Sequence, residues 1–594
     1  MVTNHGRGLG RTPYCAVGAG AAAGAYQVSG FRHLVNDPAN DQRLRVEGAP
    51  PGTDLPRTRH LMGVLAGLMA AENQASERLD TVENDNMPSG YTYLLQLVAH
   101  DCVHTSTPFW ALPNRHVPAR NGRTGRLRLD TIYGDGPTGC PFAYEPDDAN
   151  DTSRSRLRLG RMRNDPMVAE ANGELRDIGR LAGPPRGSNG PASRDPNLPW
   201  MAQPPLTEAL LADPRNDDNA LVSQITTLFH MLHNTLLGRI SEPAEWLGAM
   251  EARFACARAA TTMIYRRILR DDLLRRVLHP VVHAHYQSVF ESSGANGTLE
   301  CGPGERGSIS VPLEFSHGAF RFAHSMIRPS YRTGVPGVQP LGEALRRTSA
   351  RAPASMPLDH RWILPWSRFF QIEINGVVSS PNLSLRIRPR YTSTLNDAAW
   401  FPPPLPADAA AVPSGGVHAN GVALQDLLSA ALAGVWSVQP LYESLQRRIT
   451  ELQWPDLLGP SQLSNPEARS LALSEWMTRS RLAAAPSPRD VAALAADPPL
   501  PFYVLFEADR EHDGRCLGRL GSVIVAEVLY RAMLDDPLPG EDVRASLPQN
   551  LASLSQEILG NDALGTVPEI QEMAHLIAFI ADENGLRGAT PAFV

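Results

Sequence analysis

The sequence predicts a mainly α-helical fold. Hydrophobic residues recur at three- and four-residue steps wherever a regular pattern can be read, and this repeat is clearest over residues 219–240. Strand-like alternation is confined to two short runs, 307–311 and 384–388, each suited to one side of a small ribbon. The chain holds 48 Gly and 52 Pro in 594 residues, which favours long irregular connections. We therefore expect helices joined by long loops, with at most small β-ribbons.

The helices are expected in chain order from their own apolar stripes. Residues 59–83 place leucine, methionine and valine side chains on one broad face, and 219–240 repeat Leu, Ile and Phe on another. The remaining helices are expected at 248–292, 423–450, 467–484, 518–535 and 566–583. Long loops rich in Pro, Gly, Arg or Asp are expected at 135–206, 329–360 and 400–420. Loops of this length inside one domain usually cover a functional site, although they also suit linkers between domains.

Composition argues against several classes of protein. A net charge of −7 and a pI of about 6.2 provide no cationic field for nucleic acid or anionic lipid. Stretches of ~18 apolar residues are missing, so no transmembrane helix is expected. Residues 15–25 are small and weakly apolar, which makes a poor secretion signal. The 6 cysteines lack CxxC spacing, which argues against a zinc site and favours reduced, buried thiols.

One candidate site lies in the segment 88–101. Gln96 and His100 are four residues apart, so on a helix they project from the same face, and Asp101 turns toward a different one. Such a helix presents an imidazole and an amide to a pocket. The alternative is that His100 and Asp101 are simply the polar end of an apolar helix.

Two further segments combine charge with a helix or an apolar setting. Residues 212–219 open the helix at 219–240, and Arg215 and Asp218 would share a face of its first turn. An N-terminal capping region explains the same acidic residues structurally. His324 lies among the aromatic and aliphatic residues of 320–328, where a core histidine is the simpler reading.

Together and in this order, these motifs resemble those of the animal haem peroxidases, the peroxidase–cyclooxygenase superfamily, in their bacterial-type members. The segments 129–137 and 517–529 are also similar to parts of that family, so the resemblance spans roughly residues 60–535. It implies a large single-domain helical haem peroxidase fold. The implied division is an N-terminal extension at 1–55, a haem peroxidase domain at 56–540, and a C-terminal helical tail at 541–594 packed on that domain.

The resemblance implies a role for each motif. His100 would move a proton between the two oxygens of hydrogen peroxide as general base and then general acid. Arg215 would stabilise charge on the departing oxygen, and Gln96 would hold water or halide over the iron. His324 would be the axial ligand of the haem iron. Asp218, Phe320 and Arg321 would complete the haem-binding set.

Departures from the family pattern concern the haem itself. Family members usually back the axial histidine with an Asn, and the matching register puts Trp476 at that position, with Glu475 beside it. The carboxylate that precedes the distal histidine in mammalian members is Ala99 here, so that ester link cannot form. A methionine that makes a third link in one branch is Asn219, which leaves Asp218 for a single link. We expect haem b, bound non-covalently or through one ester.

The family also implies a calcium site beside the distal histidine. Asp101 and Thr124 match its ligands, and the Arg126 carbonyl and Asp130 fall at ligand spacing. Arg128 occupies a position that is usually Asp. Its guanidinium would repel a divalent cation, or would replace it by pairing with Asp101.

The function implied is reduction of hydrogen peroxide, with oxidation of a halide, phenol or similar small reductant through a ferryl-porphyrin radical, as in responses to oxidative stress. Fatty-acid dioxygenases of the superfamily use a tyrosine three residues before the axial histidine, and Arg321 stands there. This replacement favours a peroxidase. Two alternatives remain open: an oxygenase working through another tyrosine such as Tyr93, and a catalytically weak haem-binding or interaction relative. The reductant and the oligomeric state are open as well.

Overall fold

The computed structural model describes residues 31–35, 55–71, 82–105, 121–146, 154–163, 175–181, 208–240, 249–292, 299, 311–397, 399–401, 421–479, 486–589 and 591–594. Within them the predicted mainly α class is confirmed. Helices form most of the structure, and each sheet of the described residues is a two-stranded antiparallel ribbon. In this part of the chain, no helix is long and apolar enough to cross a membrane.

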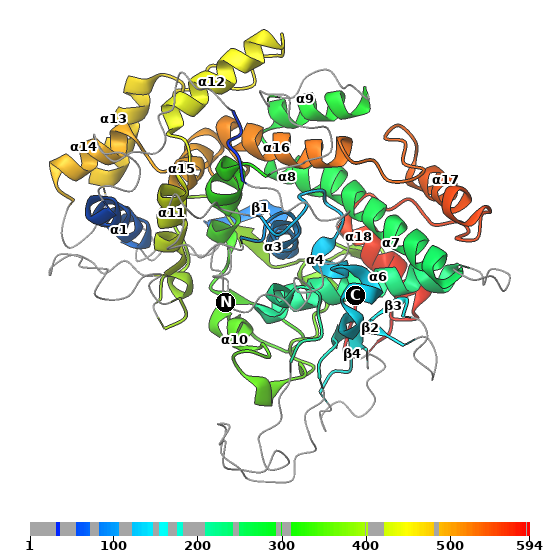
Figure 1. Ribbon diagram of the computed structural model, residues 1–594. Coiled ribbons are helices and arrows are strands. Elements are labelled where there is room, and N and C mark those ends of the chain that lie inside the picture. The colour runs from blue at the N-terminus through cyan, green and yellow to red at the C-terminus, as the bar shows by residue number, and fades with distance from the viewer. Residues whose placement is uncertain are drawn as a thin grey trace.

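Two buried helices occupy the middle of the molecule (Figure 1). They are α3 (Gly90–Cys102) and α6 (Ala220–Arg239), which contact each other directly. In α6 every residue from 220 to 234 is buried, so its polar side chains need hydrogen-bond partners within the protein. Thr226 and Thr227 donate to carbonyls of the preceding turn. The Asn234 side chain bonds both the N–H and the carbonyl of Leu157. These two helices provide a rigid frame for side chains carried at their ends.

The other elements surround this centre. On one side of Figure 1 lie α1 (Leu55–Ala71) and the row of α12 (Val438–Glu451), α13 (Pro466–Thr478) and α14 (Pro488–Ala496). On the other side lie α7 (Ala249–Ile268), α17 (Leu547–Leu559) and α18 (Met573–Glu583). The remaining helices are α4 (Asp130–Tyr133), α5 (Gly136–Gly139), α8 (Leu274–Val277), α9 (Pro280–Glu291), α10 (Leu341–Arg346), α11 (Gly421–Ala433), α15 (Leu500–His512) and α16 (Arg519–Leu534).

The ribbons are short and join distant segments. In β1 (Glu83–Pro88) and β10 (Leu383–Leu385), Glu83 pairs with Leu385 and Pro88 with Leu383, with an irregularity between them. The expected strand at 384–388 is therefore present only in part, and the one at 307–311 lies outside the described residues except for Val311. The other pairs are β2 (Tyr144–Glu145) with β3 (Arg156–Leu157), β4 (Leu159–Gly160) with β5 (Asp177–Ile178), β6 (Ser330–Tyr331) with β7 (Gln339–Pro340), and β8 (Glu373–Ile374) with β9 (Val377–Val378).

Two helices expected to be continuous are interrupted. The segment 248–292 is divided by a π-helical turn at Leu269–Leu273, and Pro280 starts a new helix after the cap His279. The segment 423–450 is divided after Ala433, where Gly434 takes a positive φ of 70° and ends the helix. The sequence reading missed α14, α15 and α17. In α15 the residues from Leu500 to Ala508 are all buried, so no polar face marks the helical period.

Close backbone contact fixes the start of α3. The Gly90 N–H donates to the Phe369 carbonyl across 2.8 Å, and a Cβ at Gly90 would lie 2.4 Å from the Phe370 ring. Only glycine fits this approach, and so α3 begins directly after the turn at Ser89. At α6 the side chain of Asn219 accepts hydrogen bonds from the N–H groups of Leu221 and Val222.

The first and the last described segments pack against other parts of the fold. Residues 31–35 lie along the segment near 312–314, where Leu313 N–H donates to the Arg32 carbonyl and Leu34 N–H to the Glu314 carboxylate. At the other end, α17 contacts α7 and α18 contacts α6. The domain limits at 56 and 540 stay a prediction.

The cysteines differ from the expectation at one position. Cys102, Cys256 and Cys516 are free thiols, as expected. Cys140 is in a disulfide. The expectation that every thiol is reduced is therefore wrong, because cysteines distant in sequence meet only in the folded chain.

Candidate active site

A cavity lies between α3 and the turns that follow residue 313. Those turns are a π-helical turn, η10 (Glu314–Gly318), and a 3₁₀ helix, η11 (Ala319–Met326). About 40 Å³ of the cavity can hold the centres of water molecules, and the space between the lining atoms is about 580 Å³ when the part open to solvent is counted. Its described lining residues are Thr92, Tyr93, Leu95, Gln96, Ala99 and Val103 from α3 and its end, and Ser316, Phe320, Arg321, Ala323, His324 and Ile327 from the facing segment. A mostly apolar wall with a few polar groups is typical of a cofactor site.

The predicted axial histidine lies in this wall. His324 is buried on η11, and its Nδ1 lies 2.7 Å from Oδ2 of Asp426, a buried carboxylate on α11. A carboxylate can only accept here, so Nδ1 carries the proton and Nε2 is the ring nitrogen suited to bind a metal. The pairing of an imidazole with a carboxylate is the usual support of a metal-bound histidine.

Asp426 is shared by two more buried side chains. The Tyr391 hydroxyl donates to Oδ2 across 2.8 Å, and Nη1 of Arg321 lies 3.2 Å from Oδ1. Burial and the neighbouring Asp426 charge raise the pKa of Tyr391 well above its usual range, so the phenol stays protonated. Each carboxylate oxygen of Asp426 therefore has at least one donor.

The expected register for the residue behind the axial histidine is wrong. Trp476 lies on α13, where its ring packs against Phe502 at 5.0 Å between centroids, and Glu475 is half-exposed and pairs with Arg479. Asp426 takes the position instead, 102 residues after His324. The available signal was a single acidic residue inside the otherwise apolar helix 421–433, where a buried carboxylate needs a partner.

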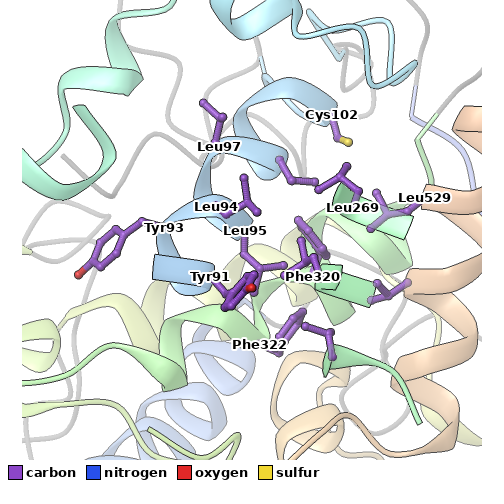
Figure 2. Close-up of a cluster of buried hydrophobic side chains, with 14 of the residues drawn as sticks. Tyr91, Tyr93, Leu94, Leu95, Leu97, Cys102, Leu269, Phe320, Phe322 and Leu529 are labelled. Atoms are coloured by element: carbon purple, nitrogen blue, oxygen red, sulfur yellow. The ribbon is translucent and has the colours of Figure 1, made fainter. Parts of the chain in front are cut away.

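On the opposite wall, Gln96 faces the cavity from α3. Its Oε1 accepts a hydrogen bond from the Asn219 amide across 3.2 Å. Its Nε2 is buried and has no hydrogen-bond partner among the described residues. Figure 2 shows the apolar cluster around α3, with Tyr93 pointing away from the part that contains Phe320 and Phe322. A buried amide donor at this position suits a ligand that has a hydrogen-bond acceptor.

His100 lies one turn further along α3 and is fully buried. Its Nδ1 lies 2.8 Å from the Asn216 side-chain oxygen, and the Asn216 amide nitrogen donates to the Thr131 carbonyl, which defines the orientation of the amide. Nδ1 is therefore protonated and Nε2 is the basic nitrogen. Burial, followed by the Arg215 charge, lowers the pKa of His100 to about 3. Asn216 was missed by the sequence reading, and His100 is not among the described residues that line the cavity.

Arg215 makes contacts that differ from the expected ones. It precedes α6 in a 3₁₀ turn (Pro214–Asp217) instead of standing in the first turn of the helix. Its guanidinium donates to Asp213 and to the backbone carbonyls of Val103 and His100, at 2.6 and 2.7 Å for the two carbonyls. The group is buried, and it is absent from the described lining of the cavity. This geometry supports the structural alternative for Arg215.

The remaining expected haem-binding residues are divided. Phe320 and Arg321 line the cavity, and the Phe320 ring stacks on Phe315 at 4.4 Å between centroids. Asp218 is buried but is absent from the described lining, and burial raises its pKa to about 7. A single ester through Asp218 stays a prediction.

The groups expected to bind calcium are held by other contacts. Asp101 accepts the N–H groups of Leu129 and Thr131, at 3.0 and 3.3 Å. The Arg126 carbonyl accepts from the buried guanidinium of Arg266 across 2.8 Å. Among the described residues, no group of three or more His, Cys, Asp or Glu side chains could hold a metal ion. An arginine at a carbonyl that would bind the cation does not fit a calcium cage.

The other side chains of that loop also have protein partners. Thr124 donates to Asp130 across 2.7 Å, and Arg128 pairs with both oxygens of Asp536. The expected alternative, in which Arg128 pairs with Asp101, is therefore wrong. Leu127 and Leu129, on either side of Arg128, both have left-handed backbone conformations, with φ of 51° and 57°.

One comparison with known proteins covers the segment that contains His324. Residues 169–362 match the family model for the animal haem peroxidase. The predicted resemblance to this family is confirmed. The matched range contains Arg215 and His324, whereas Gln96 and His100 lie before it. A search of curated protein sequences gave no significant match.

Two solved structures share the fold of this chain. Peroxidase A from Dictyostelium discoideum is 14% identical, with a TM-score of 0.53 and coverage of 94% of each chain. The fatty acid alpha-dioxygenase of Oryza sativa is 12% identical, with a TM-score of 0.51 and coverage of 94% of this chain and 88% of that one. The family model that matches is that of a haem peroxidase. The residue types of the cavity, which are an imidazole oriented by a carboxylate, apolar walls and an amide donor, suit a haem.

Proposed function

We propose that the protein is a haem-dependent peroxidase that reduces hydrogen peroxide and oxidises a small reductant. The observation that carries this proposal is His324, which stands in the wall of an apolar cavity with its Nδ1 proton held by the buried Asp426. An imidazole oriented in this way presents Nε2 as the nitrogen that can bind a metal. The family match over the same segment supports the assignment.

Each side chain of the candidate site would have a separate role in this reaction. When bound, haem supplies the iron at which peroxide is reduced. His324 would bind it from one wall, with Phe320 and Arg321 beside it. Gln96 would donate a hydrogen bond from the facing helix. His100 would accept a proton at Nε2, because its low pKa keeps the ring neutral at physiological pH.

Arg215 would contribute by holding the distal helix. Its bonds to the His100 and Val103 carbonyls tie the end of α3 to the turn before α6. Asn216, the next residue, then meets the His100 ring. In this proposal the Arg215 guanidinium positions His100. The alternative is that Arg215 contacts peroxide directly.

An absorption spectrum with added haem tests the function. The wild-type protein should show a Soret band that responds to stoichiometric peroxide, and His324→Ala should lose stable haem. His230→Gln is a suitable control, because His230, on α6, is also buried but its ring bonds the Arg158 carbonyl. A wild-type protein that binds no haem would refute the proposal, and full haem content in His324→Ala would refute the ligand assignment.

Oxygenation of a fatty acid is the second candidate. It is favoured by the shared fold of the Oryza sativa alpha-dioxygenase and by Tyr93, a buried phenol that lines the cavity and donates to Tyr331 across 2.9 Å. Arg321 at the position of the radical-forming tyrosine argues against it. Oxygen uptake with linoleate in the presence of catalytic peroxide, lost in Tyr93→Phe, would establish this activity in place of the first.

A further inference from the structure

We propose that Asp426, Tyr391 and Arg321 form a positioning cluster that sets how strongly His324 donates to the haem iron. This inference rests on the proposed function, since it needs His324 as the axial ligand. The four side chains are buried and come from three segments: His324 and Arg321 from η11, Tyr391 from the loop before the 3₁₀ turn at Ser393–Asn396, and Asp426 from α11. The sequence alone does not show that Asp426, Tyr391 and Arg321 act together on His324.

The centre of the cluster is one carboxylate oxygen with two donors. Oδ2 of Asp426 accepts from Nδ1 of His324 at 2.7 Å and from the Tyr391 hydroxyl at 2.8 Å. A charged acceptor at Nδ1 gives the imidazole part of the character of imidazolate, which strengthens donation from Nε2. The Tyr391 hydrogen bond withdraws electron density from the same oxygen. Tyr391 therefore opposes the effect of Asp426 on His324.

Arg321 places a cation beside the same carboxylate. Its Nη1 lies 3.2 Å from Oδ1 of Asp426, and its Nε donates to the Ser316 carbonyl across 2.9 Å, which holds the guanidinium in place. A buried carboxylate with no cation nearby would be strongly destabilised, and the pairing with Arg321 offsets this cost beside His324. An asparagine at the same position would accept the same proton without a charge.

The placement of α11 makes the contact specific. A Cβ at Gly421, the first residue of α11, would lie 2.3 Å from the Leu395 carbonyl, and this glycine has a φ of 87°. The start of α11 is thus packed onto the turn that follows Tyr391. Asp426 and Tyr391 are held in one unit, and His324 meets both, with its ring centroid 6.0 Å from that of Tyr391.

The reduction potential of the haem-loaded protein tests the cluster. In Asp426→Asn the ratio of ferrous to ferric protein at a fixed solution potential should rise at least tenfold. This corresponds to an increase of about 59 mV in the one-electron reduction potential. In Tyr391→Phe the ratio should shift the opposite way, because Asp426 then acts on His324 undiminished. Tyr530→Phe is the matched control: Tyr530 is equally buried, but its hydroxyl bonds Gln287 on α9, so the ratio should stay unchanged.

Resonance Raman spectra of the ferrous proteins give a second readout. The iron–histidine stretching frequency should fall in Asp426→Asn and rise in Tyr391→Phe. Opposite shifts in both measurements support the cluster. Unchanged or parallel shifts in haem-loaded variants would overturn it, and if Asp426→Asn loses haem, Tyr391→Phe alone decides. A wild-type protein without haem would instead refute the proposed function.

Discussion

The side-chain oxygen of Asn216 lies 2.8 Å from Nδ1 of His100 and thereby orients the ring of the proposed base. Asn216 is itself held, because its amide nitrogen donates to the Thr131 carbonyl across 3.1 Å. The two residues are 116 positions apart and meet where the end of α3 crosses the turn before α6. The contact makes Nε2 the basic nitrogen, which is the requirement for accepting a proton.

Replacement of His100 tests this role. His100→Ala should retain haem and slow the second-order reaction with hydrogen peroxide by ~10²–10⁴-fold, the usual range for a lost general acid–base. Asn216→Ala should slow it less, since the ring remains but its tautomer is no longer imposed. Stopped-flow absorbance measures both. Equal rates in His100→Ala and the wild type would show that His100 is only the polar end of α3.

Arg215 distinguishes a structural from a catalytic guanidinium. Because it is buried on Asp213 and two carbonyls, Arg215→Gln should reduce the free energy of unfolding by about 3 kcal/mol. Arg123 also pairs with Asp213 and donates to the His100 carbonyl, so Arg123→Gln is the matched control. Denaturant unfolding and the peroxide rate should be measured for both variants. A stable Arg215→Gln that loses the rate, beside an active Arg123→Gln, would establish a direct catalytic role.

The loop near Asp101 should be independent of calcium. Arg266 donates to the Arg126 and Leu127 carbonyls and also to the Asp536 carbonyl and Glu541, so it performs the bridging that a cation would. Excess chelator should leave the melting temperature unchanged, whereas Arg266→Gln should lower the free energy of unfolding by about 3 kcal/mol.

The control for the loop is Arg587→Gln, whose ion pair with Asp582 is more than half exposed and should matter little. Differential scanning calorimetry with and without chelator measures all three proteins. Destabilisation of the wild type by chelator, reversed by added calcium, would contradict the prediction and support a calcium site.

Asp218 should make stability depend on pH. Burial raises the pKa of its carboxyl to about 7, well above the value of ~3.9 in an unfolded chain. Between these values the folded state binds more protons than the unfolded state, so the contribution of Asp218 is present at low pH and is lost as pH rises toward 7. Asp218→Asn removes the titration. Its stability relative to the wild type should rise from pH 4 to pH 7.5, by at most about 4 kcal/mol.

Urea unfolding of both proteins at a series of pH values measures this difference. Parallel stability curves would show that Asp218 titrates normally. If Asp218 forms an ester with haem, acid–acetone treatment of the loaded wild type should leave haem on the polypeptide, and Asp218→Asn should release it.

Much of the helical framework was predictable because amphipathic helices leave a periodic pattern. The helix at 219–240 is α6 almost to the residue, and the short ribbons match the scarcity of alternating segments. The position of His324 in an apolar wall agrees with its aromatic neighbours in the sequence. By contrast, α15 is buried on all sides over most of its length, and such a helix carries no period to detect.

The sequence by itself determined the helical class, the family resemblance and the histidines at 100 and 324, because these depend on local periodicity and on motifs of a few residues. The tertiary structure alone decided which partners these histidines have: Asp426 for His324 and Asn216 for His100. It also placed Arg215 on Asp213 and Arg266 on the Arg126 carbonyl. Such contacts join segments roughly a hundred residues apart or bury charges against each other. Their free energy depends on the distance between the groups and on their desolvation, and neither can be read from the order of residues in the chain.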